Sequence, residues 1–233
     1  MLEADKLTKR FQERLAVDAL QLRVAPGEIY ALLGPNGAGK TTTINMFLGF
    51  LAPDDGEARV CGVSVARDPV AARRLLAYIP EQVALYPRFS GIENLDYFSA
   101  LGGKSHTRQE LYELLERAGL QREAADRRVS GYSKGMRQKV GIALALATGA
   151  KALLLDEPTS GLDPAASHEF SRLLRRLASE GVAILMATHD LFRAREDASH
   201  VGILLGGKLV AQFTQRELEG SDLEALYLEK LRA

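Results

Sequence analysis

The stretch Gly34-Pro35-Asn36-Gly37-Ala38-Gly39-Lys40-Thr41 fits the pattern G-x-x-x-x-G-K-[ST] of a phosphate-binding loop, or P-loop. The apolar residues 28–33 before it predict a buried strand, and residues 42–48 after it predict the opening of a helix. In this context the glycines let backbone N–H groups converge on phosphate oxygens, and the helix N-terminus adds partial positive charge. We expect Lys40 to reach the β- and γ-phosphates of a nucleotide and Thr41 to offer its hydroxyl to Mg²⁺.

The composition is that of an ordinary globular chain and limits its partners. The chain has 233 residues, 46% hydrophobic and 26% charged, which is enough for a large core. Thirty basic residues balance thirty acidic ones, so we expect no nucleic-acid partner. The single Cys61 excludes an internal disulfide and fits a reducing cytoplasm. Because the longest apolar run, residues 140–150, is too short to cross a bilayer, work at a membrane would need another chain.

Hydrophobic periodicity and turn residues divide the chain into strands and helices. Strands are expected at residues 2–11, 20–24, 28–33, 58–65 (a short pair), 75–79, 152–155, 182–187, 201–205 and 209–213. Helices are expected at residues 42–48, 69–74, 91–101, 107–118, 134–147, 164–179, 191–197 and 218–231. Only helices are expected between residues 82 and 148. The sequence therefore predicts an α/β nucleotide-binding core interrupted by a helical insert.

Two carboxylates, Asp156 and Glu157, follow the apolar strand expected at residues 152–155. At the C-terminal edge of a strand beside the P-loop, Asp156 would hold Mg²⁺ directly or through water. Glu157 would then orient and deprotonate an attacking water. Taken alone, the same residues describe a strand that ends in a solvated acidic turn, and the P-loop upstream favours the catalytic interpretation.

The stretch at residues 129–138 comes directly before a long predicted helix. Ser133 is placed to cap that helix, where free backbone N–H groups would form an anion site. As a bare helix cap this feature is common, so by itself it is a weak signal.

Together, five stretches resemble the ATP-binding subunit of ABC transporters in order and spacing, over nearly the whole chain. They are the P-loop, Pro80-Glu81-Gln82, Tyr132-Ser133-Lys134-Gly135-Met136 (the signature), Leu153-Leu154-Leu155-Asp156-Glu157-Pro158, and Ser160-Gly161-Leu162-Asp163 followed by His189. The resemblance implies an α/β fold with a P-loop NTPase (RecA-like) core, an antiparallel β subdomain and an inserted α-helical subdomain. We expect one domain over residues 1–233, with the core and β subdomain at 1–81 and 150–233 and the helical signature subdomain at 82–149.

The resemblance also implies an ATPase with ATP and Mg²⁺ as cofactors. Glu157, His189 and Lys40 would be catalytic. Phe11 would stack on adenine, although it fits equally well as one more apolar strand residue. His189 would contact the γ-phosphate, although a lone histidine in such a turn is usually structural. The implied ATP-binding residues are Phe11, Gly34, Pro35, Asn36, Gly37, Ala38, Gly39, Lys40, Thr41 and Thr42, and the implied metal ligands are Thr41, Asp156, Glu81 and Gln82.

The implied partners are a second ATP-binding subunit and a membrane permease. The family closes as a head-to-tail homodimer or pseudo-dimer around two nucleotides. In such a dimer Ser133, Lys134, Gly135 and Met136 would face the ATP held by the other subunit. Asp163 would link the two halves, and it could also cap the helix that begins at Pro164. We expect the chain in the cytoplasm, held at the inner face of the cell membrane by its permease.

Two of these stretches depart from the commonest pattern of the family. The signature is Tyr-Ser-Lys-Gly-Met where Leu-Ser-Gly-Gly-Gln is the commonest form, and its Lys134 resembles exporter-type branches. The glutamine that normally follows the proline directly is replaced by Glu81, and Gln82 comes one residue later. Either side chain could reach Mg²⁺ and the attacking water, so the sequence leaves both open.

The leading functional hypothesis is an ATPase subunit that powers transport, in the direction of export, through a separate permease. One rival is a soluble ABC-type ATPase that is not coupled to transport. Another is a nucleotide-gated regulatory module without turnover, which the presence of both Glu157 and His189 disfavours. The transported substrate cannot be read from the sequence.

The segment at residues 83–90 is the expected docking site for the permease. It is apolar but fits neither helical nor strand periodicity, and Pro87 discourages regular structure. Such a segment is often an interaction surface. The alternative is that Leu85, Tyr86 and Phe89 fill the core of the helical insert.

Overall fold

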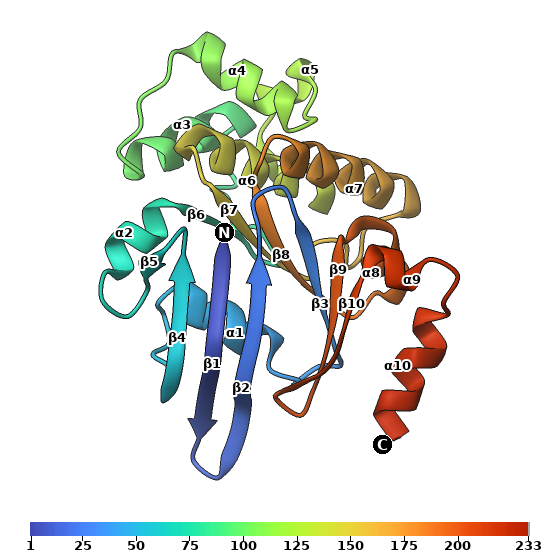
Figure 1. Ribbon diagram of the computed structural model, residues 1–233. Helices are drawn as coiled ribbons and strands as arrows, with labels where there is room; N and C mark the ends of the chain where they lie inside the picture. Colours follow the sequence, from blue (N-terminus) through green and yellow to red (C-terminus); the bar gives the residue numbers. More distant parts are fainter. Residues whose placement is uncertain (233) are drawn as a thin grey trace.

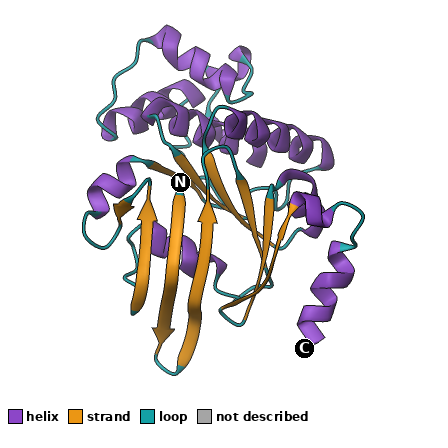
Figure 2. Ribbon diagram, in the orientation of Figure 1, coloured by secondary structure: helices purple, strands orange, loops and turns teal. Residues whose placement is uncertain are grey.

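The computed structural model describes residues 1–232 and contains two sheets (Figures 1 and 2). The larger sheet has the strand order β10-β9-β3-β8-β7-β6. All its neighbouring strands are parallel except β10, which pairs antiparallel with β9. Its strands are β3 (Ile29–Leu33), β6 (Leu76–Ile79), β7 (Ala152–Asp156), β8 (Ala183–Thr188), β9 (His200–Leu205) and β10 (Lys208–Thr214).

The smaller sheet is antiparallel, with the order β2-β1-β4-β5. Its strands are β1 (Leu2–Phe11), β2 (Arg14–Val24), β4 (Asp55–Val60) and β5 (Val63–Ser64). The strand expected at residues 20–24 is therefore six residues too short at its start. The reason is that β1 and β2 pair with register shifts and Ala19 has a positive φ of 47°, which breaks the alternation of buried and exposed residues.

Strand β3 separates two hydrophobic cores, which explains why all five of its residues are buried. Ile29, Ala31 and Leu33 face the core made with the helices, whereas Tyr30 and Leu32 face the core between the two sheets. Helix α1 (Lys40–Phe47) leaves β3 and lies in that second core, with Phe47 fully buried. Each such large apolar side chain contributes about 1.5–3 kcal/mol on burial, so the P-loop is held between two packed elements.

The segment expected to contain only helices contains α3 (Gly91–Leu101), α4 (Arg108–Arg117), the short α5 (Arg122–Ala125), a 3-10 turn at Val129–Gly131, and α6 (Lys134–Thr148). Capping boxes at Ser90 and Thr107 start α3 and α4. Helix α6 packs against α3, α4, α7 and β6, and so joins this segment to the larger sheet (Figure 1).

The remaining helices are α2 (Pro69–Arg74), α7 (Pro164–Ser179), α8 (Leu191–Asp197), α9 (Gln215–Leu218) and α10 (Leu223–Arg232). The helix expected at residues 218–231 is present as α10, but it begins five residues later than expected. Leu218 ends α9, and Gly220, with a φ of 83°, turns the chain before α10 begins. Within residues 1–232, no helix combines the length and apolarity needed to span a bilayer.

Candidate active site

The P-loop lies between the end of β3 and the start of α1, and its shape depends on glycine at two close approaches. A Cβ at Gly34 would collide with the carbonyl oxygen of Leu204. Gly39 has a φ of 110°, and a Cβ there would collide with the carbonyl oxygen of Ala16. The loop can therefore adopt this backbone path only with glycine at these positions.

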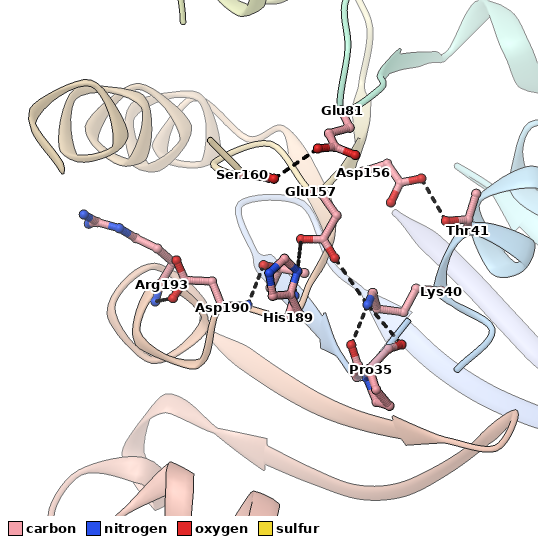
Figure 3. A network of polar contacts seen from close by, with 12 residues as sticks. Pro35, Lys40, Thr41, Glu81, Asp156, Glu157, Ser160, His189, Asp190 and Arg193 are labelled. Carbon is pink, nitrogen blue, oxygen red and sulfur yellow. Dashed lines mark hydrogen bonds and ion pairs between the residues drawn. The ribbon is translucent and has the colours of Figure 1, made fainter. Parts of the chain in front are cut away.

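Lys40 is buried, with 6% of its side chain exposed, and its ammonium group lies inside the loop. It donates hydrogen bonds to the carbonyl oxygens of Gly34 and Pro35. It also lies 3.3 Å from Oε1 of Glu157 (Figure 3). The carboxylate of Glu157 thus supplies the counter-charge for a lysine that burial would otherwise destabilise.

Glu157 joins Lys40 to His189. Its backbone has a positive φ of 47°, which is unusual for a residue with a side chain. Nδ1 of His189 lies 2.8 Å from Oε2 of Glu157, and the His189 backbone N–H also donates to Oε2. Oε1 is buried and accepts no hydrogen bond. A carboxylate held in this way, with Oε2 fixed by His189 and Oε1 paired only with the Lys40 ammonium, can take a proton from a water molecule.

Asp156 ends β7 beside the P-loop. The Thr41 hydroxyl donates a 3.0 Å hydrogen bond to Oδ2 of Asp156. Burial raises the pKa of Asp156, the Thr41 hydrogen bond opposes that rise, and the neighbouring Glu157 charge adds to it. A hydroxyl and a carboxylate are the oxygen ligands that Mg²⁺ prefers. No cluster of three His, Cys, Asp or Glu side chains fit for a metal occurs in residues 1–232. A magnesium ion here would therefore take its other ligands from phosphate and water.

These groups line a cavity of about 510 Å³. Phe11 stands at the end of β1, with 47% of its surface exposed, and the Lys9 ammonium lies 5.8 Å from the centroid of its ring. Of the P-loop residues expected to bind ATP, Gly34 and Ala38 are not among those that line the cavity. The lining residues are Phe11, Arg14, Ala16, Pro35, Asn36, Gly37, Gly39, Lys40, Thr41, Thr42, Glu81, Asp156 and Glu157.

Two of the lining residues, Arg14 and Ala16, were not expected from the sequence. Arg14 donates a 2.6 Å hydrogen bond to the carbonyl oxygen of Gly37. The β1–β2 hairpin brings both residues to the P-loop from the other sheet. No local pattern indicates this approach; the only signal is a basic residue three positions after Phe11.

The structure separates Glu81 from Gln82. Glu81 lines the cavity with Asp156 and Glu157, whereas Gln82 lines a second, more apolar cavity of about 400 Å³. Ser160 and Lys134 donate hydrogen bonds to Oε1 of Glu81, at 3.0 and 3.4 Å, and these contacts lower its pKa. Of the two metal ligands left open, the geometry thus brings only Glu81 to the other candidate ligands.

The signature residues do not meet the P-loop within one chain. Ser133 caps α6, where its hydroxyl accepts a hydrogen bond from the Met136 backbone N–H at 3.3 Å. None of Ser133, Lys134, Gly135 and Met136 is among the described residues that line the 510 Å³ cavity. Asp163 caps α7 by accepting from the Ala166 backbone N–H at 2.9 Å, which is the capping role considered for it.

Sequence comparison finds relatives that match nearly the whole chain. The chain is 40% identical over 224 residues to the Nod factor export ATP-binding protein I of Paraburkholderia xenovorans (strain LB400), which covers 95% of this chain and 73% of that protein. It is 36% identical over 222 residues to the daunorubicin/doxorubicin resistance ATP-binding protein DrrA of Streptomyces peucetius, covering 94% and 67%.

Solved structures agree with these relatives. An ATP-binding subunit of an ABC transporter superposes with a TM-score of 0.84 at 32% identity, over 98% of both chains. A dimeric ATP-binding cassette in a post-hydrolysis state, bound to ADP and Pi, superposes with a TM-score of 0.81 at 25% identity, over 93% of this chain and 99% of that one. These likenesses confirm the predicted fold, a P-loop NTPase with an antiparallel sheet and inserted helices.

The family model described as ABC transporter matches residues 17–160, from the second strand of the smaller sheet to the loop after β7. This range includes the P-loop, all three carboxylates of the cavity and the signature. The chain therefore belongs to the ABC transporter family, as an ATP-binding subunit that hydrolyses ATP to power transport.

Proposed function

We propose that this ATPase drives export through a separate membrane permease, and that the cavity bounded by the P-loop, Asp156 and Glu157 is its hydrolytic centre. The observation that carries the site is the contact of Glu157 with both Lys40 and His189. Export is favoured by two relatives, whose names describe Nod factor export and resistance to daunorubicin and doxorubicin. The chain would then work in the cytoplasm, at the inner face of the membrane.

In this proposal each group has one task. Lys40 exchanges its contacts with the loop carbonyls for the β- and γ-phosphates of ATP, and Phe11 stacks on the adenine. Thr41, Asp156 and Glu81 would hold Mg²⁺ together with phosphate and water oxygens, and its charge would offset that of the phosphates. Glu157 removes a proton from the attacking water through Oε1, the oxygen that Lys40 leaves when it turns to the phosphates. His189, at 2.8 Å from Oε2, fixes the orientation of that carboxylate.

We propose that two subunits form each complete site. The phosphate cavity of one chain lacks the signature residues, and Ser133 presents the N-terminus of the 15-residue helix α6 as a separate anion site. A head-to-tail dimer would place this helix end against the nucleotide of the partner. A dimeric cassette with ADP and Pi among the solved structures supports this arrangement.

Hydrolysis should therefore require association of two chains, and the rate per subunit should rise with protein concentration. A mixture of the Lys40→Ala and Ser133→Arg variants should recover activity that neither variant has alone. In the mixed dimer, one site combines an intact P-loop with an intact signature. Phosphate release measured over a dilution series, with sedimentation on the same samples, tests this. A constant specific activity from a chain that stays monomeric would exclude the composite site.

The permease, we propose, docks on a surface formed by residues 83–90 and helix α3. The 400 Å³ cavity here is lined mainly by apolar residues of β6, the segment 83–85, α3 and α6. Tyr86 and Phe89 lie at its edge, 46% and 38% exposed. Tyr86 stacks on Phe98, and both Tyr86 and Phe89 meet the ring of Tyr97 edge-on. Gln82 opens into the same cavity while its neighbour Glu81 lines the nucleotide site. Because one peptide bond joins Glu81 to Gln82, a movement of Glu81 on ATP binding would shift the surface on which the permease helix docks.

A further inference from the structure

The carboxylate of Glu81 lies where three loops meet. Glu81 follows β6, Ser160 follows β7, and Lys134 opens α6. Oε1 of Glu81 accepts from the Ser160 hydroxyl at 3.0 Å (Figure 3) and from the Lys134 ammonium at 3.4 Å. Lys134 also lies against the Ser160 loop, because a Cβ on Gly161 would be 3.8 Å from its Nζ. The contact therefore ties the start of α6 to both strands that carry the candidate carboxylates.

The charges that line the cavity indicate what the contact between Lys134 and Glu81 does. Three carboxylates, Glu81, Asp156 and Glu157, line a cavity that must accept a polyphosphate. Glu157 has the counter-charge of Lys40, and Asp156 is hydrogen-bonded to the Thr41 hydroxyl. For Glu81 the paired cation among the described residues is Lys134. Without Lys134, the Glu81 carboxylate would keep only the hydrogen bond from Ser160 and carry an uncompensated charge that repels the phosphates.

We propose that Lys134 is a positioning residue that holds Glu81 beside Ser160 in the nucleotide-free subunit and away from the incoming phosphates. This inference rests on the phosphate site proposed above. It also explains the two departures from the common family pattern as one compensating pair. A glutamate in place of glutamine at position 81 brings a negative charge to the cavity, and a lysine in place of glycine at position 134 offsets and anchors it.

The test is a double-mutant cycle on nucleotide affinity, with Glu81→Gln, Lys134→Gln and both together. The probe is fluorescent MANT-ADP in EDTA, because ADP lacks the γ-phosphate that would bring the signature of a second subunit to the site. Lys134→Gln should weaken ADP binding by about 1.4- to 5-fold, the range expected for a partly exposed ion pair. With Gln at position 81, the same substitution should change the affinity little. The effect should shrink as salt is added.

A matched control is available on the same helix. Lys139 pairs with Glu169 of α7 at 2.9 Å, outside the cavity. Lys139→Gln removes the same charge from α6 and should leave ADP affinity unchanged. Hydrogen exchange gives a second readout. Peptides that contain residues 79–82 should exchange about 1.4- to 5-fold faster in Lys134→Gln and in Ser160→Ala, but not in Lys139→Gln.

The possible outcomes distinguish a failure of the Lys134–Glu81 proposal from a failure of the proposed nucleotide site. An equal loss of affinity with Glu or Gln at position 81 would show that Lys134 does not act through Glu81. No loss in either background, with unchanged exchange, would overturn the pair while leaving the nucleotide site intact. Failure of the wild-type chain to bind MANT-ADP at all would instead refute the proposed site.

Discussion

Replacing Glu157 by glutamine should lower ATP turnover by about 10²- to 10⁴-fold, the contribution typical of a positioned acid–base group. The substitution keeps the size of the side chain but leaves an amide oxygen that cannot take a proton from water. ATP should remain bound, because the change removes a negative charge next to the phosphates. Release of inorganic phosphate measures turnover, and MANT-ATP fluorescence measures binding on the same protein.

Lys40→Ala provides the contrasting variant. It should weaken binding of the triphosphate itself, since Lys40 is the buried cation of the loop. His189→Ala should fall between the two, with ATP bound and turnover reduced, because the carboxylate of Glu157 loses the partner at 2.8 Å that orients it. A Glu157→Gln protein that hydrolyses ATP at the wild-type rate would show that another group removes the proton.

The parts of the site that are contiguous in sequence could be predicted from it. The P-loop, the strand before it and the Asp156-Glu157 pair each combine a local pattern with a definite chemistry. The approach of Arg14 and Ala16 could not, because it depends on how a hairpin of the smaller sheet lies over the loop. The directions in which Glu81 and Gln82 point could not be predicted from the sequence either. Neighbouring residues in an irregular segment point to different sides, and only the backbone decides which cavity each one enters.

Errors in secondary structure arose where backbone geometry departs from a regular period. Ala19 is one example, since its positive φ coincides with a register shift between β1 and β2. The six residues of β2 before Leu20 were therefore not predicted as strand. Gly220 is another, since periodicity alone continued a helix across the turn that it makes. The helical insert was easier to predict, because its apolar residues recur at helical spacing; the capping boxes at Ser90 and Thr107 are seen in the structure.

Polar substitutions at Tyr86 and Phe89 should abolish transport and the co-purification of the permease. The two rings form a cluster with Tyr97 and Phe98, with centroids 5.0 to 6.1 Å apart, at the edge of the apolar cavity. Aromatic side chains clustered on a surface are typical of the residues that dominate binding energy at protein interfaces. Tyr86→Ser with Phe89→Ser therefore removes the anchor, while the nucleotide cavity, lined by other residues, keeps its basal ATPase activity.

The exposure of these rings decides between docking and a purely structural role. Because Tyr86 and Phe89 are 46% and 38% exposed, their loss should cost the isolated subunit little stability, which thermal unfolding would measure. Phe192→Ser is the matched control, since this ring on α8 is 61% exposed and lies outside the cluster. Co-purification should survive that change. If thermal stability and ATPase activity fall together in the Tyr86 and Phe89 variants, the rings serve the core of the helical segment. If transport and co-purification are unchanged, the permease docks on another surface.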